Sequence, residues 1–273
     1  MRRSQRIRTL AIGAALALGA VVTSFPFVWM VLSSLKPLSE SRSIPPTVLP
    51  STLTFDAYQQ LFSQLDFARY LLNTLGVVAL SFVGMLLVVV AGYGFAKFRF
   101  PFRDAMFMVA LATMMIPAQV TMIPTFLILN GVHLVNTLLG IAAPTLVSGF
   151  TLFLARQFMT TIPDEILEAA RLDGAGELRV LRSVVMPMSK PILAVLGVLT
   201  FIGGWNSFLW PLVIATDSDN YTLSVGLSLL NRQLTVNPAL QMAGASVMVV
   251  PILIVFVLLQ RHIVRGFALS GLK

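Results

Sequence analysis

The side chains best equipped for polar chemistry crowd into one short stretch of the sequence, EILEAARLDGAGELRVLRSVVMPMSKP, at residues 165–191. With Asp164 directly before it, this stretch carries nine charged residues between segments that carry almost none. Carboxylates and guanidinium groups at this density suit ion pairs at the rim of a protein interface. Cysteine is absent, which excludes thiolate metal sites and thiol catalysis, and His133 and His262 stand alone in expected loops. We therefore expect no catalytic residue and no metal site.

The charged stretch is predicted to fold as two short helices joined by a tight turn. Asp164, three residues after Thr161, gives a start that is typical of a capping box. Gly174 suits the left-handed position that ends a helix, and a second helix is expected at about residues 175–186. The apolar positions expected to share a face are Ile166, Ala169 and Ala170 in the first helix, and Leu178, Leu181 and Val185 in the second. A solvated loop would explain the charged residues, but it would not explain why residues typical of a helix start and a helix end occur at these positions.

Long apolar runs make up most of the remaining sequence. Of all residues 57% are hydrophobic and 11% are charged, whereas soluble proteins carry about 25% charged residues. A helix needs roughly 20 apolar residues to cross a bilayer. Such spans are predicted at about residues 10–32, 71–95, 105–128, 138–158, 192–214 and 240–261, with NGVHLVN (residues 130–136) as a turn. The predicted fold class is an all-α integral membrane protein, a single domain over residues 1–273, with six transmembrane helices.

Lysine and arginine predict the orientation of these spans. If the N-terminus, the second and fourth loops and the C-terminus share one side, that side holds 15 of the 19 basic residues. The positive-inside rule then places both termini and the charged stretch in the cytoplasm. Acidic residues divide almost evenly, so the basic excess indicates topology and not nucleic-acid binding. The first apolar run continues to about Leu32, too long for a signal peptide, and a retained membrane helix is expected.

Two prolines, Pro117 and Pro124, lie seven residues apart in the third predicted span. Proline frees backbone carbonyl groups and bends a transmembrane helix. The bend is either a packing kink or the wall of a cavity, to which Gln119 and Thr121 would contribute polar groups. The sequence leaves both interpretations open.

The spacing inside the charged stretch carries a resemblance to a known family. Membrane subunits of bacterial ATP-binding-cassette importers share a cytoplasmic loop of the form EAA, three residues, G, nine residues, I-x-L-P. This sequence matches it with Glu168-Ala169-Ala170, three residues, Gly174, nine residues, and Val184-Val185-Met186-Pro187. Valine and methionine replace isoleucine and leucine. WNSFLWPL (residues 205–212), TLSVGL (residues 222–227) and the ending QRHIVRGFALSGLK resemble the sugar-importer group, above all the smaller six-span subunit of maltose-type importers.

This resemblance implies partners for the chain. It would form half of a translocation path with a second permease subunit in the bacterial inner membrane. A dimeric ATPase would dock on the charged stretch, a coupling helix-turn-helix between spans 4 and 5, and an extracytoplasmic solute-binding protein would deliver the cargo. The residues implied in ATPase coupling are Glu165, Glu168, Ala169, Ala170, Asp173, Gly174 and Pro187. Those implied in contact with the binding protein are Asn231, Arg232 and Asn237.

The translocation path is expected to use uncharged polar and aromatic side chains, which suit a neutral polyol. The candidates are Trp205, Asn206, Ser207, Trp210 and Gln119. The alternative is that both tryptophans anchor the helix at the membrane interface and that Asn206 joins helices by a hydrogen bond. These alternatives stay open.

The source of energy can also be argued from residues that the sequence lacks. No acidic residue and no histidine lies inside a predicted span, where ion-coupled transporters hold such groups. No G-x-x-x-x-G-K-[ST] motif occurs, so ATP and magnesium are expected on the partner ATPase and no cofactor on this chain. The predicted function is the non-catalytic membrane subunit of an ATP-driven sugar importer. The alternatives are another cargo (a polyol phosphate, amino sugar or peptide), or a self-sufficient channel or secondary carrier, which would leave the charged stretch without a role.

Overall fold

The computed structural model describes the backbone of residues 2–233 and 237–270, and the side chains of residues 8–229 and 237–260. All regular structure in these ranges is helical, as the predicted all-α class requires. The chain divides into two compact units. One comprises Met1–Phe67 and Leu227–Val250, and the other comprises Ala68–Gly226 and Pro251–Lys273.

Between four and six candidate membrane spans occur in the described residues. Four are long apolar helical segments: Arg8–Ser34 of α1 (Arg2–Ser34), α4 (Phe67–Lys97), Lys190–Ile214, and Pro238–Gln260 of α15 (Pro238–Ser270). The segment Lys190–Ile214 contains α12 (Lys190–Trp205) and α13 (Leu209–Ile214). Two further candidates are bent pairs, α5 (Arg103–Ala112) with α6 (Ala118–Gly131), and α7 (Leu138–Leu146) with α8 (Gly149–Met159).

The third predicted span is not one continuous helix. After α5 and the short 3-10 turn η1 (Thr113–Met115), the chain bends by 107° into α6. Ile116 is extended, with φ −92° and ψ 117°, because the ring of Pro117 disfavours helical geometry in the residue before it. Pro124, in contrast, lies within α6. The helix therefore breaks at Pro117, whereas Pro124 is tolerated inside α6.

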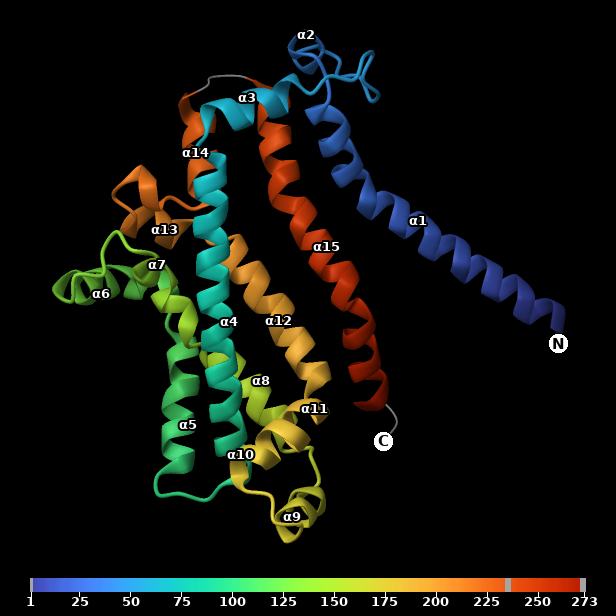
Figure 1. Cartoon of the computed structure of the whole chain (residues 1–273). Helices are drawn as coiled ribbons and strands as arrows, with labels where there is room; N and C mark the ends of the chain where they lie inside the picture. The colour runs from blue at the N-terminus through green and yellow to red at the C-terminus, as the bar shows by residue number, and fades with distance from the viewer. Residues whose placement is uncertain (1, 234–236, 271–273) are drawn as a thin grey trace. The chain divides into compact units, whose positions relative to one another are not determined.

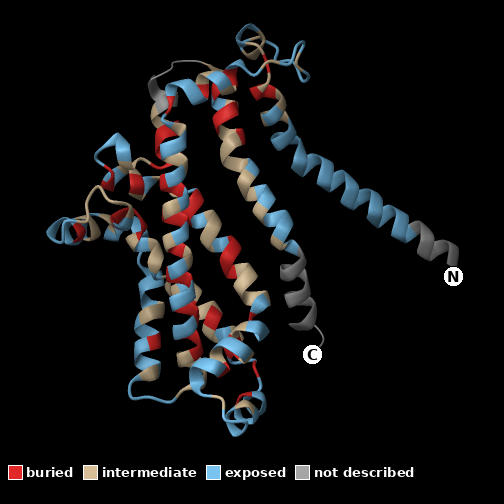
Figure 2. Cartoon of the chain, in the orientation of Figure 1, coloured by how far each residue is buried: buried red, intermediate tan, exposed pale blue. Residues whose placement is uncertain are grey.

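Helix α4 organises the packing of the second unit. Its buried residues, which include Thr74, Val77, Ser81, Met85 and Val88, recur every three or four positions, so they line one helical stripe. In Figure 1 this helix lies beside α5, and Val88 forms a cluster with Phe107 of α5 and Leu152 of α8. Figure 2 shows the buried positions distributed along the length of α4.

Small residues let α4 approach its neighbours closely. A Cβ atom on Gly84 would lie 2.2 Å from the carbonyl oxygen of Leu146 in α7, so only glycine fits there. One turn away, the hydroxyl groups of Ser81 and Thr145 share a hydrogen bond of 2.6 Å. Close backbone contact supported by hydroxyl hydrogen bonds is typical of helix pairs in membranes.

The first unit contains α1, α2 (Leu38–Ser41), α3 (Asp56–Gln64) and the start of α15. Ala57 of α3 packs against Ala239 and Ala243 of α15. The described part of α1 is exposed over most of its length, as Figure 2 shows, which leaves an apolar surface for lipid or protein. Its following loop is closed by Glu40, which accepts hydrogen bonds from Thr47 Oγ1 at 2.6 Å and Ser51 Oγ at 2.6 Å.

Candidate functional site

The charged stretch forms a helix pair around a left-handed glycine. Helix α9 (Asp164–Leu172) is followed by a turn in which Gly174 has φ +82°. The amides of Gly174 and Ala175 donate to the carbonyl groups of Arg171 and Ala170, each at 3.0 Å, a pairing that satisfies the last carbonyls of a helix. The expected role of Gly174 at the helix end is confirmed.

An ion pair bridges this turn. The Nε and Nη2 atoms of Arg171 donate to the two carboxylate oxygens of Glu177, at 2.7 and 3.3 Å. This bidentate contact raises the pKa of the Arg171 guanidinium and joins α9 to α10 (Glu177–Val180). Some of the charge in the stretch thus stabilises the helix pair itself.

The capping box predicted at Thr161 is wrong. Pro163 occupies the N-cap position of α9 and offers no side-chain acceptor, while Thr161 Oγ1 donates to the Phe158 carbonyl at 2.7 Å. Asp164 instead accepts a hydrogen bond of 2.6 Å from Lys97 Nζ, and this ammonium lowers the pKa of the Asp164 carboxyl. Lys97 is the last residue of α4, so the contact joins the end of α4 to the start of α9.

The inner face of the helix pair is anchored in a buried cluster. Leu167, Val180 and Val185 pack with Val89 of α4 and Met159 of α8, and each of these five side chains is almost fully buried. Figure 1 shows α9 just beyond the end of α4. The pair is therefore packed onto the ends of two candidate spans.

A π-helical segment changes which side chains face inward in the second helix. After α10 the chain continues as η2 (Leu181–Val185), a π-helix, and α11 (Met186–Met188). Val180 and Val185, five residues apart, are both fully buried, because the i→i+5 hydrogen bonding of a π-turn widens the helix and brings residues five apart close to the same face. The predicted face of Leu178, Leu181 and Val185 is wrong in one member, since Leu178 is 78% exposed.

The outer face of the helix pair combines acidic and apolar side chains. Of the predicted coupling residues, Ala170 packs partly against the buried cluster, and the others are exposed: Glu165, Glu168, Ala169, Asp173, Gly174 and Pro187. Leu172 (89% exposed) and Leu178 flank the glycine turn, and sequence reasoning missed both as surface residues. Both leucines lie next to the glycine-containing turn of LDGAGEL, and because turns lie at the surface, this position is the signal that could have identified them. We name Glu165, Glu168, Ala169, Leu172, Asp173 and Leu178 the coupling face.

A second candidate site is a pocket of about 230 Å³ between α6, α7 and the start of α13. Its lining residues are Ala118, Gln119, Thr121, Met122, Thr125, Pro144, Ser207, Leu209 and Trp210. Gln119, Ser207 and Trp210 were expected in the translocation path, and the structure brings these three together. The break at Pro117 starts the helix that forms one wall, in agreement with the cavity interpretation of that bend.

Two of the expected path residues lie outside this lining. Trp205 is only 3% exposed and stacks on Phe201, with ring centroids 5.5 Å apart and planes 16° apart. Asn206 is exposed at the C-cap of α12. The chain leaves helical geometry at residues 206–208, which separates the surroundings of Trp205 from those of Trp210.

The pocket is uncharged, and its largely apolar lining carries a few neutral polar groups. Within the described part of the chain its lining offers hydroxyl, amide and indole groups and no ionisable side chain. The indole of Trp210 is held in place, since Nε1 donates to the Gly140 carbonyl at 3.1 Å. An aromatic face beside neutral hydrogen-bonding groups suits a neutral hydroxylated ligand.

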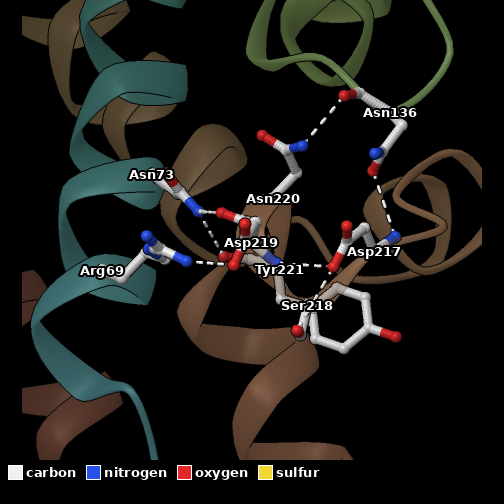
Figure 3. A network of polar contacts seen from close by, with 8 residues as sticks. All are labelled: Arg69, Asn73, Asn136, Asp217, Ser218, Asp219, Asn220 and Tyr221. Carbon is white, nitrogen blue, oxygen red and sulfur yellow. Dashed lines mark hydrogen bonds and ion pairs between the residues drawn. The ribbon is translucent and has the colours of Figure 1, made fainter.

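A network of polar contacts holds the loop that follows α13 (Figure 3). Asn73 of α4 donates to the carbonyl oxygens of Asp219 and Tyr221 at 2.8 and 3.0 Å, and Arg69 pairs with the Asp219 carboxylate. On the other side of the loop, Asn136 Oδ1 accepts the amides of Thr216 and Asp217, each at 3.1 Å. The loop is thus fastened both to α4 and to the turn between α6 and α7.

The residues expected to contact a binding protein are only partly described. The side chains of Asn231 and Arg232 lie outside the described residues. Asn237 Oδ1 accepts the Leu240 amide at 3.2 Å at the start of α15, and its Nδ2 donates to Gln60 Oε1 at 3.0 Å. Asn237 therefore caps α15 and joins it to α3. Its side-chain oxygen and nitrogen, which were predicted to contact a binding protein, both make hydrogen bonds within the chain.

Comparisons with known proteins cover the whole chain. Residues 84–268 match the family of binding-protein-dependent transport system inner membrane components. The arabinooligosaccharides transport system permease protein AraQ of Halalkalibacterium halodurans is 30% identical, over 100% of this chain and 99% of that protein. The sn-glycerol-3-phosphate transport system permease protein UgpE of Yersinia pestis is 33% identical, over 92% of each chain. A chain of a bacterial ABC transporter involved in the import of the acidic polysaccharide alginate shares the fold, with TM-score 0.81 and 24% identity over 95% of this chain and 97% of that one.

Proposed function

Because the chain belongs to the family of inner-membrane components of binding-protein-dependent transport systems, we propose that it is the permease subunit of an ATP-driven importer of a neutral carbohydrate. It is a multi-pass protein of the bacterial inner membrane. The observation that carries the choice of cargo is the pocket between α6, α7 and α13, whose described lining is uncharged and combines apolar side chains with an indole ring and neutral hydroxyl and amide groups.

Charge separates the candidate cargoes. A phosphate or carboxylate group is normally held by arginine, lysine or several backbone amides. Gln119, Thr125 and Ser207 supply neutral donors and acceptors, which suit sugar hydroxyl groups, and Trp210 supplies a face for a sugar ring. A polyol phosphate is the second candidate, since a relative of this chain is named for sn-glycerol 3-phosphate transport. An amino sugar or a charged peptide would find no counter-ion on these walls.

Energy would reach the pocket through the coupling face. Leu172 and Leu178 offer apolar area that a partner would bury, and Glu165, Glu168 and Asp173 surround it with negative charge. We assign this face to docking of a dimeric ATPase that holds ATP and magnesium, with the face and both termini in the cytoplasm. A second permease subunit would complete the path. An extracytoplasmic binding protein would deliver the cargo near Asn231 and Arg232.

Transport by the complete system tests this proposal. The chain is reconstituted in proteoliposomes with its candidate partner subunit, ATPase and binding protein, and uptake of radiolabelled arabinotriose is compared with uptake of glycerol 3-phosphate. We expect ATP-dependent uptake of the neutral sugar. Gln119→Leu should raise its half-saturating concentration, whereas Val120→Leu, one residue outside the lining, should not.

Three outcomes would contradict parts of the proposal. Uptake without ATPase would indicate a secondary carrier or channel. Uptake of glycerol 3-phosphate alone would reverse the assignment of cargo. Glu168→Lys changes a residue on the exposed side of α9. If sugar-stimulated ATP hydrolysis is unchanged in this variant, the proposed role of the coupling face in ATPase docking is contradicted.

A further inference from the structure

Asn136, in the turn between α6 and α7, makes four hydrogen bonds to the region around the end of α13. Its backbone amide donates to the Ile214 carbonyl at 3.0 Å, and its carbonyl accepts from Asn220 Nδ2 at 2.9 Å. Its side-chain oxygen accepts two further amides, those of Thr216 and Asp217. Figure 3 shows Asn136 reaching this loop from the opposite side to Asn73 and Arg69.

The backbone at this position explains the choice of residue. Asn136 has φ +57°, in the left-handed region that asparagine enters more readily than most residues. Its short amide then lies close enough to accept backbone N–H groups that follow α13. Glycine would match the backbone but would provide no acceptor.

These bonds act on one wall of the pocket. Helix α13 has six residues, too few to hold its position without tertiary contacts. It is restrained near its start by the bond from Trp210 Nε1 to the Gly140 carbonyl, and beyond its end by Asn136. Ser207, Leu209 and Trp210, which line the pocket, belong to this short segment and to the link before it.

We propose that Asn136 is a positioning residue that fixes α13 against the turn between α6 and α7 and so sets the position of Trp210 in the pocket. Loss of two neutral hydrogen bonds changes a local equilibrium by roughly five- to a hundredfold. In Asn136→Gly the segment should therefore sample a second position. The consequence for cargo uptake rests on the proposed function, but the position of Trp210 does not.

Fluorine NMR of the full chain in lipid nanodiscs tests the position directly. The sequence has three tryptophans, so 5-fluorotryptophan gives three resonances, which single Trp→Phe variants assign. We expect Asn136→Gly to shift or broaden the Trp210 resonance and to leave those of Trp29 and Trp205 unchanged. Asn136→Asp, which keeps the acceptor, should restore the wild-type resonance.

His133→Gly is the matched control. His133 lies in the same turn with φ +56°, and no hydrogen bond from its side chain occurs among the described contacts. This variant should leave all three resonances unchanged. If Asn136→Gly does not insert, Asn220→Ala removes one bond of the same set and should shift the Trp210 resonance less, in the same direction.

The uptake assay then separates this inference from the proposed function. With arabinotriose as the probe, Asn136→Gly should raise the half-saturating concentration at least about fivefold, with a maximal rate within about twofold of wild type. An unchanged Trp210 resonance in Asn136→Gly would overturn the positioning role, whatever the uptake. A shifted resonance with wild-type uptake would support the positioning role and refute the path through the pocket.

Discussion

Leu178→Ala should weaken ATPase binding without weakening the fold. The substitution removes about three carbon atoms, each worth about 0.8 kcal/mol on burial. Leu178 is 78% exposed in the chain alone, so a docked partner could bury most of this area and gain about 1.9 kcal/mol. Complete burial therefore corresponds to a loss of affinity of about twentyfold, and half burial to about fivefold.

The assay is titration of the candidate ATPase onto the membrane subunits in nanodiscs, together with chemical unfolding of each variant. Two alanine variants serve as controls. Leu87→Ala removes a leucine that is 67% exposed on α4, so ATPase affinity should not change. Val180→Ala alters a fully buried side chain and should lower the free energy of unfolding by about 1–3 kcal/mol. Wild-type affinity in Leu178→Ala, or instability equal to that of Val180→Ala, would refute the assignment of the coupling face.

Two further predictions concern packing and pH. Gly84→Ala should cost about 1–3 kcal/mol in unfolding free energy because its Cβ would meet the Leu146 backbone, which yields less easily than a side chain. Gly94→Ala, with open space around its Cβ in the same helix, should be neutral or slightly stabilising, and equal losses would contradict the close approach. Hydrogen bonds from Ser51 are the largest cause that lowers the pKa of Glu40 from 4.5 to about 2. Because the folded pKa is depressed, the contribution of Glu40 is fully present above about pH 4.5 and is lost as the pH falls through about 2. A carboxyl NMR titration should show a higher midpoint in Ser51→Ala, and an unchanged midpoint would contradict this cause.

The sequence predicted features that depend on local rules. The apolar run at 71–95 became α4, which is four residues longer at its start and two at its end, because helix length in a membrane follows hydropathy. Gly174 was recognisable because a helix end with positive φ favours glycine. Pro117 indicated a bend for the same kind of reason, since it restricts the residue before it.

Features set by tertiary contacts could not be predicted from these rules. The 107° direction of the bend depends on where α6 packs, which the restriction at Ile116 does not specify. The π-segment was hidden because Val180, Val184 and Val185 are all apolar, so spacings of four and five residues fit equally well. Thr161 matched a capping pattern, but Pro163 occupies the N-cap position of α9. Asp164 instead accepts a hydrogen bond from Lys97, which is distant in sequence.

Helix α4 gives a physical basis for connecting the coupling face with the pocket. Its last residue, Lys97, bonds Asp164 at the start of α9, and near its other end Asn73 holds the loop that follows α13. Its 31 residues make a rod of about 46 Å. Close-packed interiors transmit displacement because they deform little. Leu167 and Val180, on the inner side of the helix pair, pack in one buried cluster with Val89 of α4. A shift of the helix pair would therefore act on the loop that Asn136 restrains from the other side, where the position of Trp210 is determined.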